Sequence, residues 1–354
     1  MKILHLYVLR QFVVHFLVSA AGFVVIFIVV DLSNSISAYL DRGAAAAEIA
    51  SYYAWSIPYF LFLILPMAML LGSLFCVGGL SKRNELSAMK AAGVPLFRIL
   101  LPIQVFALLV SLAAWGASSD LVPRANRERA LRSFAPSSPA RQHRAQLVLR
   151  DQGGQVITFG EYRVDEKRGR KITIDRFAGS DLVSKLRADE AIWDKDRWRF
   201  MNGEIRRLIP APERVVAFDT TQVETVTLVP EDFSRESRPV EQLSTEDLLG
   251  LVNRKAKNGL AASRDRVELA LRVSFAFSNV IMVLFGLPLS SHTRQASRPL
   301  QVGICLLISF VFYGSLQAAR AMGWNDMVDP VVAVWAPNVL FGMVGGVLLK
   351  RAHT

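Results

Sequence analysis

Residues 52–80 read YYAWSIPYFLFLILPMAMLLGSLFCVGGL, a run of 29 residues without a charged side chain. An α-helix of about 20 apolar residues is long enough to cross the hydrocarbon core of a bilayer. The run therefore predicts a membrane helix. Pro58 and Pro66 predict a bend in this helix, either as a packing feature or as a hinge.

Five more mainly apolar runs flank one long polar segment, residues 119–262. The first of them is too long for the apolar part of a cleaved signal peptide, which is about 7–15 residues. Together they predict six membrane helices, with three on each side of the polar segment and both termini on one side of the membrane. The five runs are 11–32, 96–118, 273–290, 300–319 and 331–349.

The overall composition agrees with a membrane protein. Of the 354 residues, 52% are hydrophobic and only 20% are charged, whereas soluble proteins average about 25% charged residues. The formal net charge of +11 is thinly spread or lies beside apolar runs, so it does not predict nucleic-acid binding. The two cysteines, Cys76 and Cys305, both lie in apolar runs, which excludes a disulfide framework and a cysteine-based zinc site.

The short loops differ sharply in charge and so predict the orientation. One set of loops and ends carries ten basic residues and a single acid, Glu85, while the opposite loops carry Arg42 and Arg320 against four acids. Positively charged loops stay in the cytoplasm. We therefore expect cytoplasmic termini and an extracytoplasmic segment 119–262. The ten basic residues are Lys2, Arg10, Lys82, Arg83, Lys90, Arg98, Arg294, Arg298, Lys350 and Arg351.

Segment 119–262 is rich in β-forming residues, and turn residues such as Asn202–Gly203 separate its clusters. A hairpin is expected between Trp193 and Trp198, and the whole predicts a β-sandwich or jelly roll. Ser244 followed by Asp247 predicts a capped helix over 245–258 that returns to the membrane. The expected strands are 146–149, 156–162, 171–177, 191–193, 197–201, 204–208 and 215–228.

Motifs for common catalytic chemistry are missing from the sequence. There is no G-x-x-x-x-G-K-[ST] phosphate loop, no H-E-x-x-H zinc motif and no G-x-S-x-G nucleophile motif. Acidic residues do not line the apolar runs as they do in many proton-coupled transporters, since Asp31, at the edge of the first run, is the only acid near one. The sequence thus contains no recognisable catalytic constellation. The few polar side chains in the runs predict hydrogen bonds between helices rather than ligand sites: Gln104, Asn279, Gln317 and Asn338.

The loop after the second run, residues 81–95, reads SKRNELSAMKAAGVP. Ser81 suits a helix start, Gly93 suits the position just after a helix, and Pro95 prevents continuation. The loop therefore predicts a short helix over 81–93. Leu86 and Met89 lie on one narrow apolar strip of it together with Gly93.

Such a helix has three possible uses: it can lie among lipid headgroups, connect two membrane helices, or insert into the groove of a partner. Glu85 is a lone acid in a basic loop. A single carboxylate gives an arginine-bearing partner a specific handle, and this favours the partner-binding use.

Several stretches together resemble the LptF/LptG permease family, which forms the membrane part of the ABC exporter that extracts lipopolysaccharide from the inner membrane. Motifs in both membrane halves, within 1–118 and 240–354, carry the resemblance. The middle segment resembles the family only in its length and its predicted β structure. The stretches VDL at 30–32 and PMA at 66–68 are more similar to the LptG branch than to the LptF branch. The motifs are YVLRQF at 7–12, SIP at 56–58, PMAMLLG at 66–72, LSKRNELSAMKAAG at 80–93 and FVFY at 310–313.

The resemblance implies an α-helical integral membrane protein of the bacterial inner membrane with an inserted periplasmic β-jellyroll. Residues 1–118 would hold the first three membrane helices and a cytoplasmic coupling helix, 81–93. Residues 119–262 would form the jellyroll and the return helix, and residues 263–354 the last three membrane helices.

The resemblance also implies partners and no cofactor. A separate LptB-like ATPase dimer would hydrolyse ATP, a second LptF-like permease would complete the membrane unit, and LptC/LptA-like jellyrolls would receive the lipopolysaccharide. The residues that match the coupling helix are Arg83, Glu85, Leu86, Met89 and Gly93, with Glu85 at the acidic coupling position. Basic residues that relatives carry on the first helix near the periplasm are not evident, since only Arg42 lies close.

Arginines near the outer ends of the membrane helices are candidates for binding the anionic lipid head. Arg272 has a competing interpretation as an interface anchor that pairs with Glu268, four residues earlier. The candidates are Arg42, Arg124, Arg264, Arg272 and Arg320.

Apolar residues of the expected strands are candidates for contact with acyl chains, although an ordinary core is the favoured interpretation. They are Val156, Ile157, Phe159, Ile172, Ile174, Trp193, Trp198 and Phe200.

An alternative function is a membrane-anchored sensor or assembly factor whose outer domain binds a protein. The short cytoplasmic loops argue against it, because a sensor needs an output domain.

Overall fold

A computed structural model of the chain describes residues 2–41, 43–132, 143–151, 155–163, 166–178, 181–194, 197–209, 212, 214–222, 226, 239–257, 262–292 and 297–352. The chain forms two compact units. The helical unit comprises residues 1–134, 240–249 and 263–354, and the β unit comprises residues 135–239 and 250–262.

Six long helices build the helical unit, and all six are long and apolar enough to cross a membrane. Each extends beyond the apolar run that predicted it, because its polar flanks continue the same backbone hydrogen bonding. The prediction of six membrane helices is confirmed. They are α1 (Lys2–Asp41), α2 (Ala46–Lys82), α4 (Leu96–Ser119), α8 (Ser263–His292), α9 (Arg298–Trp324) and α10 (Pro330–Ala352).

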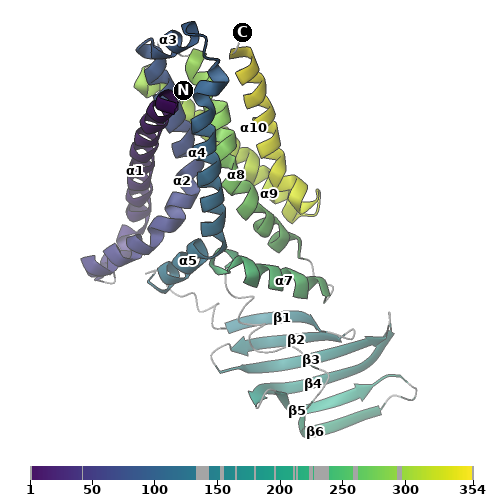
Figure 1. The fold of residues 1–354 in the computed structure, drawn as a ribbon. Coiled ribbons are helices and arrows are strands. Elements are labelled where there is room, and N and C mark those ends of the chain that lie inside the picture. The colour runs from purple at the N-terminus through teal and green to yellow at the C-terminus, as the bar shows by residue number, and fades with distance from the viewer. Residues whose placement is uncertain are drawn as a thin grey trace. The chain divides into compact units, whose positions relative to one another are not determined.

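Shorter helices lie at the two ends of this unit. In Figure 1, α3 (Glu85–Ala91) lies near both chain termini, while α5 (Leu121–Leu131) lies at the other end. The sequence did not predict α5, which belongs to the helical unit together with the 3₁₀ turn η2 (Val240–Gln242). The expected return helix is α7 (Thr245–Lys257), and Ser244 caps it by accepting a 3.1 Å hydrogen bond from the backbone N–H of Asp247.

Helix α2 lies at the centre of the helical unit and packs against α1, α8 and α9. Gly72 permits the close approach of α1, since a Cβ at this position would lie 2.9 Å from the Cα of Phe16. Gly345 does the same between α10 and α8, where a Cβ would lie 3.3 Å from the backbone nitrogen of Phe285. Small residues thus set helix separation, as is usual in membrane bundles.

Asn338 and Asn279 were both expected to bond between helices, and they behave differently. Asn338 Nδ2 donates to the carbonyl of Ser274 at 2.7 Å and to its hydroxyl at 2.9 Å, joining α10 to α8. Asn279 Nδ2 instead donates to Ala276 O of its own helix at 2.8 Å. The prediction is therefore confirmed for Asn338 and wrong for Asn279.

The described residues of the β unit form a six-stranded antiparallel sheet whose strands lie in sequence order. The inserted β domain is thereby confirmed. Its described strands form a meander, so the crossing connections of a jellyroll are not among them. The strands are β1 (His143–Asp151), β2 (Gln155–Arg163), β3 (Arg168–Ala178), β4 (Asp181–Asp194), β5 (Arg197–Arg207) and β6 (Arg214–Gln222).

The expected hairpin between β4 and β5 is present, with Trp193 paired to Trp198 across it. The expected turn at Asn202–Gly203 is wrong, because β5 runs straight through it. Asn202 adopts a left-handed φ of 50° within the strand, a conformation that asparagine tolerates better than most residues.

Candidate functional site

The loop that joins α2 to α4 holds the first candidate site. Helix α2 continues to Lys82, so Ser81 is a buried residue of its last turn and not the cap of a new helix. The helix predicted over 81–93 is therefore shorter, and it begins at Glu85 after Asn84, whose left-handed φ of 61° breaks the path of α2.

The end of α3 is formed as the sequence predicts. Gly93 has a φ of +81°, its N–H donates to Lys90 O at 2.9 Å, and the N–H of Val94 donates to Met89 O at 3.2 Å. These two bonds form a Schellman motif. Pro95 then precedes α4, so the loop contains a short helix with a well-defined end between two membrane helices.

The apolar strip of α3 faces its own subunit. Leu86 is only 5% exposed and belongs to the main core, and Met89 packs against that core. This differs from the expectation that the strip inserts into a partner. These two residues hold α3 on the bundle, which leaves the polar side of the helix for a partner.

Glu85 is the centre of a hydrogen-bonded network. Its Oε2 accepts from the hydroxyl of Tyr7 at 2.7 Å, and its Oε1 accepts from Arg83 Nε at 2.5 Å. Gln11 closes the network, since its Nε2 donates to the Tyr7 hydroxyl at 2.6 Å and its Oε1 accepts from Arg83 Nη2 at 2.9 Å. The hydrogen bond to Glu85 raises the pKa of the Arg83 guanidinium above its usual range.

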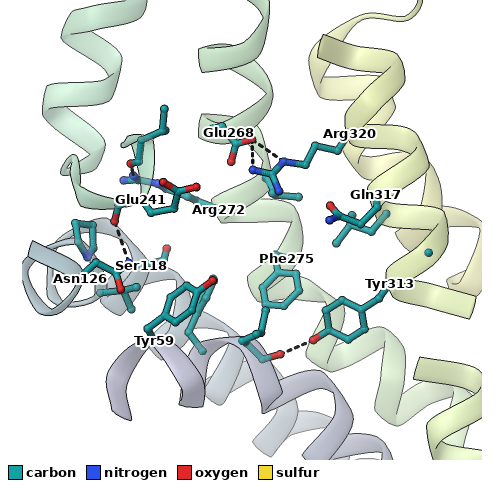
Figure 2. A pocket seen from close by; sticks show the side chains of 18 of the residues that line it. Tyr59, Ser118, Asn126, Glu241, Glu268, Arg272, Phe275, Tyr313, Gln317 and Arg320 are labelled. Carbon is teal, nitrogen blue, oxygen red and sulfur yellow. Dashed lines mark hydrogen bonds and ion pairs between the residues drawn. The ribbon is translucent and has the colours of Figure 1, made fainter. Parts of the chain in front are cut away.

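The second candidate site is a cavity of about 530 Å³ at the α5 end of the helical unit. Its volume is within the range of about 300–1,000 Å³ that is typical of ligand pockets. Aromatic side chains form much of the wall, including Tyr59, Phe275 and Tyr313. Figure 2 shows the polar groups of Glu268, Arg272 and other residues around it. The Tyr313 hydroxyl bonds to Leu63 O and so joins α9 to α2 at the wall of the cavity.

Arg272 is an anchor for the segment 240–245. Its Nη1 donates to Thr245 Oγ1 at 2.9 Å, and its Nη2 donates to the carbonyls of Val240 at 3.1 Å and Leu243 at 2.7 Å. From the other side, Asn126 Nδ2 on α5 donates to Glu241 O at 3.0 Å. Two helices thus hold this segment.

The expected pairing of Arg272 with Glu268 is replaced by another ion pair. Glu268 Oε1 accepts from Arg320 Nε at 2.6 Å, and Arg320 Nη2 lies 2.5 Å from the same oxygen. Both residues line the cavity together with Arg272. The structure thus brings two of the predicted arginines, 272 and 320, to one site.

The other predicted arginines lie elsewhere. Arg124 pairs with Asp120, its side chain being 72% exposed. The guanidinium carbon of Arg264 lies 5.8 Å from the centre of the Trp324 ring. Arg42 lies outside the described residues.

Most acyl-contact candidates of the β unit form its core. Those with buried side chains are Ile157, Phe159, Ile172, Ile174, Trp198 and Phe200. Trp193 packs against this cluster, and Val156 is half-buried. Among the described residues there is no group of three or more His, Cys, Asp or Glu side chains that could hold a metal ion.

Comparison with known proteins gives one family along nearly the whole chain. Residues 6–351 match the family model of the lipopolysaccharide export system permease LptF/LptG. The chain belongs to the LptF/LptG permease family. The match runs through both membrane halves and the β insertion.

Individual relatives agree with this membership and favour one branch slightly. The permease LptG of Haemophilus influenzae is 24% identical over 307 residues, which is 81% of each chain. LptG of Escherichia coli K12 is 22% identical over 92% of this chain and 93% of its own length. LptF of the same strain is 19% identical over 89% of this chain and 86% of its own length, so LptG is slightly closer by identity.

As a member of the LptF/LptG permease family with six membrane helices, the chain is a multi-pass inner-membrane protein and a transporter component. The sequence places Arg83 and Glu85 in the predicted coupling loop, but their contacts with Tyr7 and Gln11 are seen only in the structure. The sequence contains a partial signal for this network: Tyr7 and Gln11 are four residues apart, so they share one face of α1 and can act together.

Proposed function

We propose that the chain is a membrane subunit of an ABC exporter that extracts lipopolysaccharide from the inner membrane and passes it toward a periplasmic bridge. The observation that carries this proposal is the family match over residues 6–351, which includes both membrane halves and the β insertion. The relatives are named as permeases of lipopolysaccharide export. The chain itself would perform no catalysis, and a separate LptB-like ATPase dimer would hydrolyse ATP.

The proposed topology has cytoplasmic termini and a periplasmic β domain. It is supported by the ten basic residues in the loops and ends that share a side with α3, because positive loops remain cytoplasmic. The helical unit also has both termini and α3 at one end (Figure 1). In functional terms the periplasmic insertion would be residues 119–262, between membrane segments 1–118 and 263–354.

The ATPase would dock on the polar side of α3. Glu85 is 28% exposed and Arg83 is 52% exposed, so both are open to a partner. A carboxylate offers about four acceptor sites, and Glu85 uses one on each oxygen for Tyr7 and Arg83. A partner arginine would take the remaining sites. Leu86 and Met89 would hold α3 against the bundle, and Gly93 would end the helix.

The lipid would meet this subunit at the outer end of the helical unit. The cavity is mainly apolar and too small for a whole lipopolysaccharide, and Glu241 and Glu268 in its wall balance Arg272 and Arg320. It therefore suits part of an acyl chain better than an anionic group. Exposed Arg124 and Arg264, together with Arg42, would attract the anionic head electrostatically. A second LptF-like permease would complete the path, and LptC/LptA-like domains would accept the lipid from the β unit.

The test is affinity purification of the tagged chain from its native membrane. We expect an ABC ATPase and a second permease to copurify, and Glu85→Lys to lower the amount of ATPase recovered. The matched control is Asp41→Lys, which makes the same charge reversal at the other end of α1. Recovery of a periplasmic protein without any ATPase would instead support the sensor or assembly factor.

A further inference from the structure

The network around Glu85 joins two parts of the chain that are far apart in sequence. Tyr7 and Gln11 belong to the first membrane helix, whereas Arg83 and Glu85 belong to the junction of α2 and α3. The Tyr7–Glu85 bond spans 78 positions and measures 2.7 Å, and the Arg83–Gln11 bond spans 72 positions and measures 2.9 Å. Helix α3 is therefore tied to α1 directly and not only through the α2 backbone.

These bonds hold one carboxylate from two sides. Tyr7 reaches Oε2 and Arg83 reaches Oε1, so the carboxylate plane cannot rotate without breaking one of them. Hydrogen bonds to an ionised group are among the strongest in proteins. Since α3 has only seven residues and Leu86 is its buried residue, this network fixes the polar side of the helix, as Leu86 fixes its apolar side.

Helix α1 is suited to respond to α3 because it packs against its own subunit along one face only, the face of Val8, Phe12 and Phe16. Only 22% of its most apolar window is buried in the subunit, against 67% for α2. A helix held along a narrow face moves as a rigid body more readily than one surrounded by neighbours. A displacement of α3 would thus reach α1 at its second and third turns, which hold Tyr7 and Gln11.

We propose that Tyr7 and Gln11 are positioning residues for the Glu85 carboxylate, and that the four-residue network transmits movement of α3 to the first membrane helix. The inference rests on the proposed function, since it takes α3 as the docking site of the ATPase. It adds a direct mechanical connection between that site and α1.

The first test compares Tyr7→Phe with Tyr53→Phe in the exporter complex purified with its ATPase. Both variants remove one hydroxyl that bonds a carboxylate, but the hydroxyl of Tyr53 bonds Asp31 at 3.0 Å toward the opposite end of α1. We expect Tyr7→Phe to lower the lipopolysaccharide released per ATP about threefold, since the lost bond is an exposed one, and to lower ATPase recovery less than Glu85→Gln does. Tyr53→Phe should match the parent in both measurements.

A double variant separates positioning from general stability. If Tyr7 acts through Glu85, Tyr7→Phe combined with Glu85→Gln should export no less than Glu85→Gln alone, because coupled residues are not additive. Parental export per ATP in Tyr7→Phe would overturn the inference while leaving the docking proposal intact. Normal ATPase recovery and export in Glu85→Gln would overturn the docking proposal and the inference together.

A distance measurement tests the mechanical connection itself. Spin labels can be placed at Ile3→Cys on α1, which is 87% exposed, and at Ser87→Cys on α3, while native Cys76 and Cys305 are fully buried. We expect a single narrow distance in the complex, with and without ATP. With Tyr7→Phe added, the distribution should broaden when ATP is bound. An equally narrow distribution in that variant would contradict the inference.

Discussion

Arg320 on α9 and Glu268 on α8 form an ion pair in which Nε and Nη2 of the arginine both approach the same carboxylate oxygen, at 2.6 and 2.5 Å. The two side chains are only 22% and 12% exposed. The guanidinium carbon also lies 4.6 Å from the centre of the Trp324 ring. The pair therefore joins two membrane helices at the wall of the cavity, in surroundings where neither charge can be left alone without cost.

Removal of one partner of this pair should destabilise the helical unit. In Glu268→Ala the Arg320 charge stays in a mostly buried place without its carboxylate, which typically costs about 3 kcal/mol. The control is Asp120→Ala, which breaks the pair with Arg124, whose side chains are 72% and 55% exposed, and should cost less than about 1 kcal/mol. Unfolding in detergent by heat or denaturant measures both. Equal effects of the two variants would show that burial does not strengthen the Arg320–Glu268 pair.

Arg272 should act on the segment 240–245 more than on lipid. Arg272→Ala removes three hydrogen bonds from a charged donor, and we expect a loss of about 2–4 kcal/mol, with faster amide hydrogen exchange in residues 240–249. Arg272→Lys should recover only part of the protection, since an ammonium lacks the planar fork that reaches several acceptors. The control is Arg266→Ala, which removes an exposed arginine of the same helix. Unchanged exchange in Arg272→Ala would contradict the anchor.

The β unit should lose stability in acid partly through Glu190. Its hydrogen bond with Arg168 holds the pKa of the Glu190 carboxyl below its usual value, and the charges of Arg168 and Arg170 act in the same direction. Because the pKa is lower in the folded state, the ionised group stabilises the fold above the unfolded pKa of about 4.3. That contribution disappears as the pH falls through the folded pKa.

Hydrogen exchange in β3 and β4 measures this effect. We expect the parent protein to lose more protection between about pH 5 and pH 3 than Glu190→Gln does. Asp181→Asn, at the exposed start of β4, serves as the control and should behave as the parent. A loss of protection in Glu190→Gln as large as that in the parent would exclude Glu190 as a source of the acid sensitivity.

The membrane helices were predictable because a bilayer imposes one rule on every span, a run of about 20 apolar residues. The end of α3 was predictable for a similar reason, since few residues besides glycine accept the φ of +81° at position 93. Ser81 was misjudged because a good capping residue can also end a longer helix, and only the packing of α2 decides between these roles.

Side-chain partners across the bundle were not predictable from sequence. Glu268 is four residues before Arg272 and suggested a local pair, yet Arg320, which is 52 positions away, forms the bond. Helix α5 was missed because its arginines looked like part of the polar insertion. The helix has a buried face that includes Val122 and Ala125. This face is apparent only when α5 packs against the helical unit. Such partners depend on tertiary packing that local patterns do not encode.

Gly72 should be the position where α1 and α2 tolerate the least added volume. A Cβ there would lie 2.9 Å from Phe16 Cα and 3.1 Å from its backbone nitrogen. Backbone atoms cannot rotate away as a side chain can, so Gly72→Ala must push the two helices apart, and overpacking of this kind costs about 1–3 kcal/mol.

The control is Gly79→Ala in the same helix, where a Cβ meets nothing within 4 Å and alanine should be neutral or stabilising by up to about 1 kcal/mol. Thermal unfolding of the purified protein in detergent compares the two variants. A stability of Gly72→Ala equal to that of Gly79→Ala would mean that α1 shifts freely and that Gly72 does not set its distance from α2.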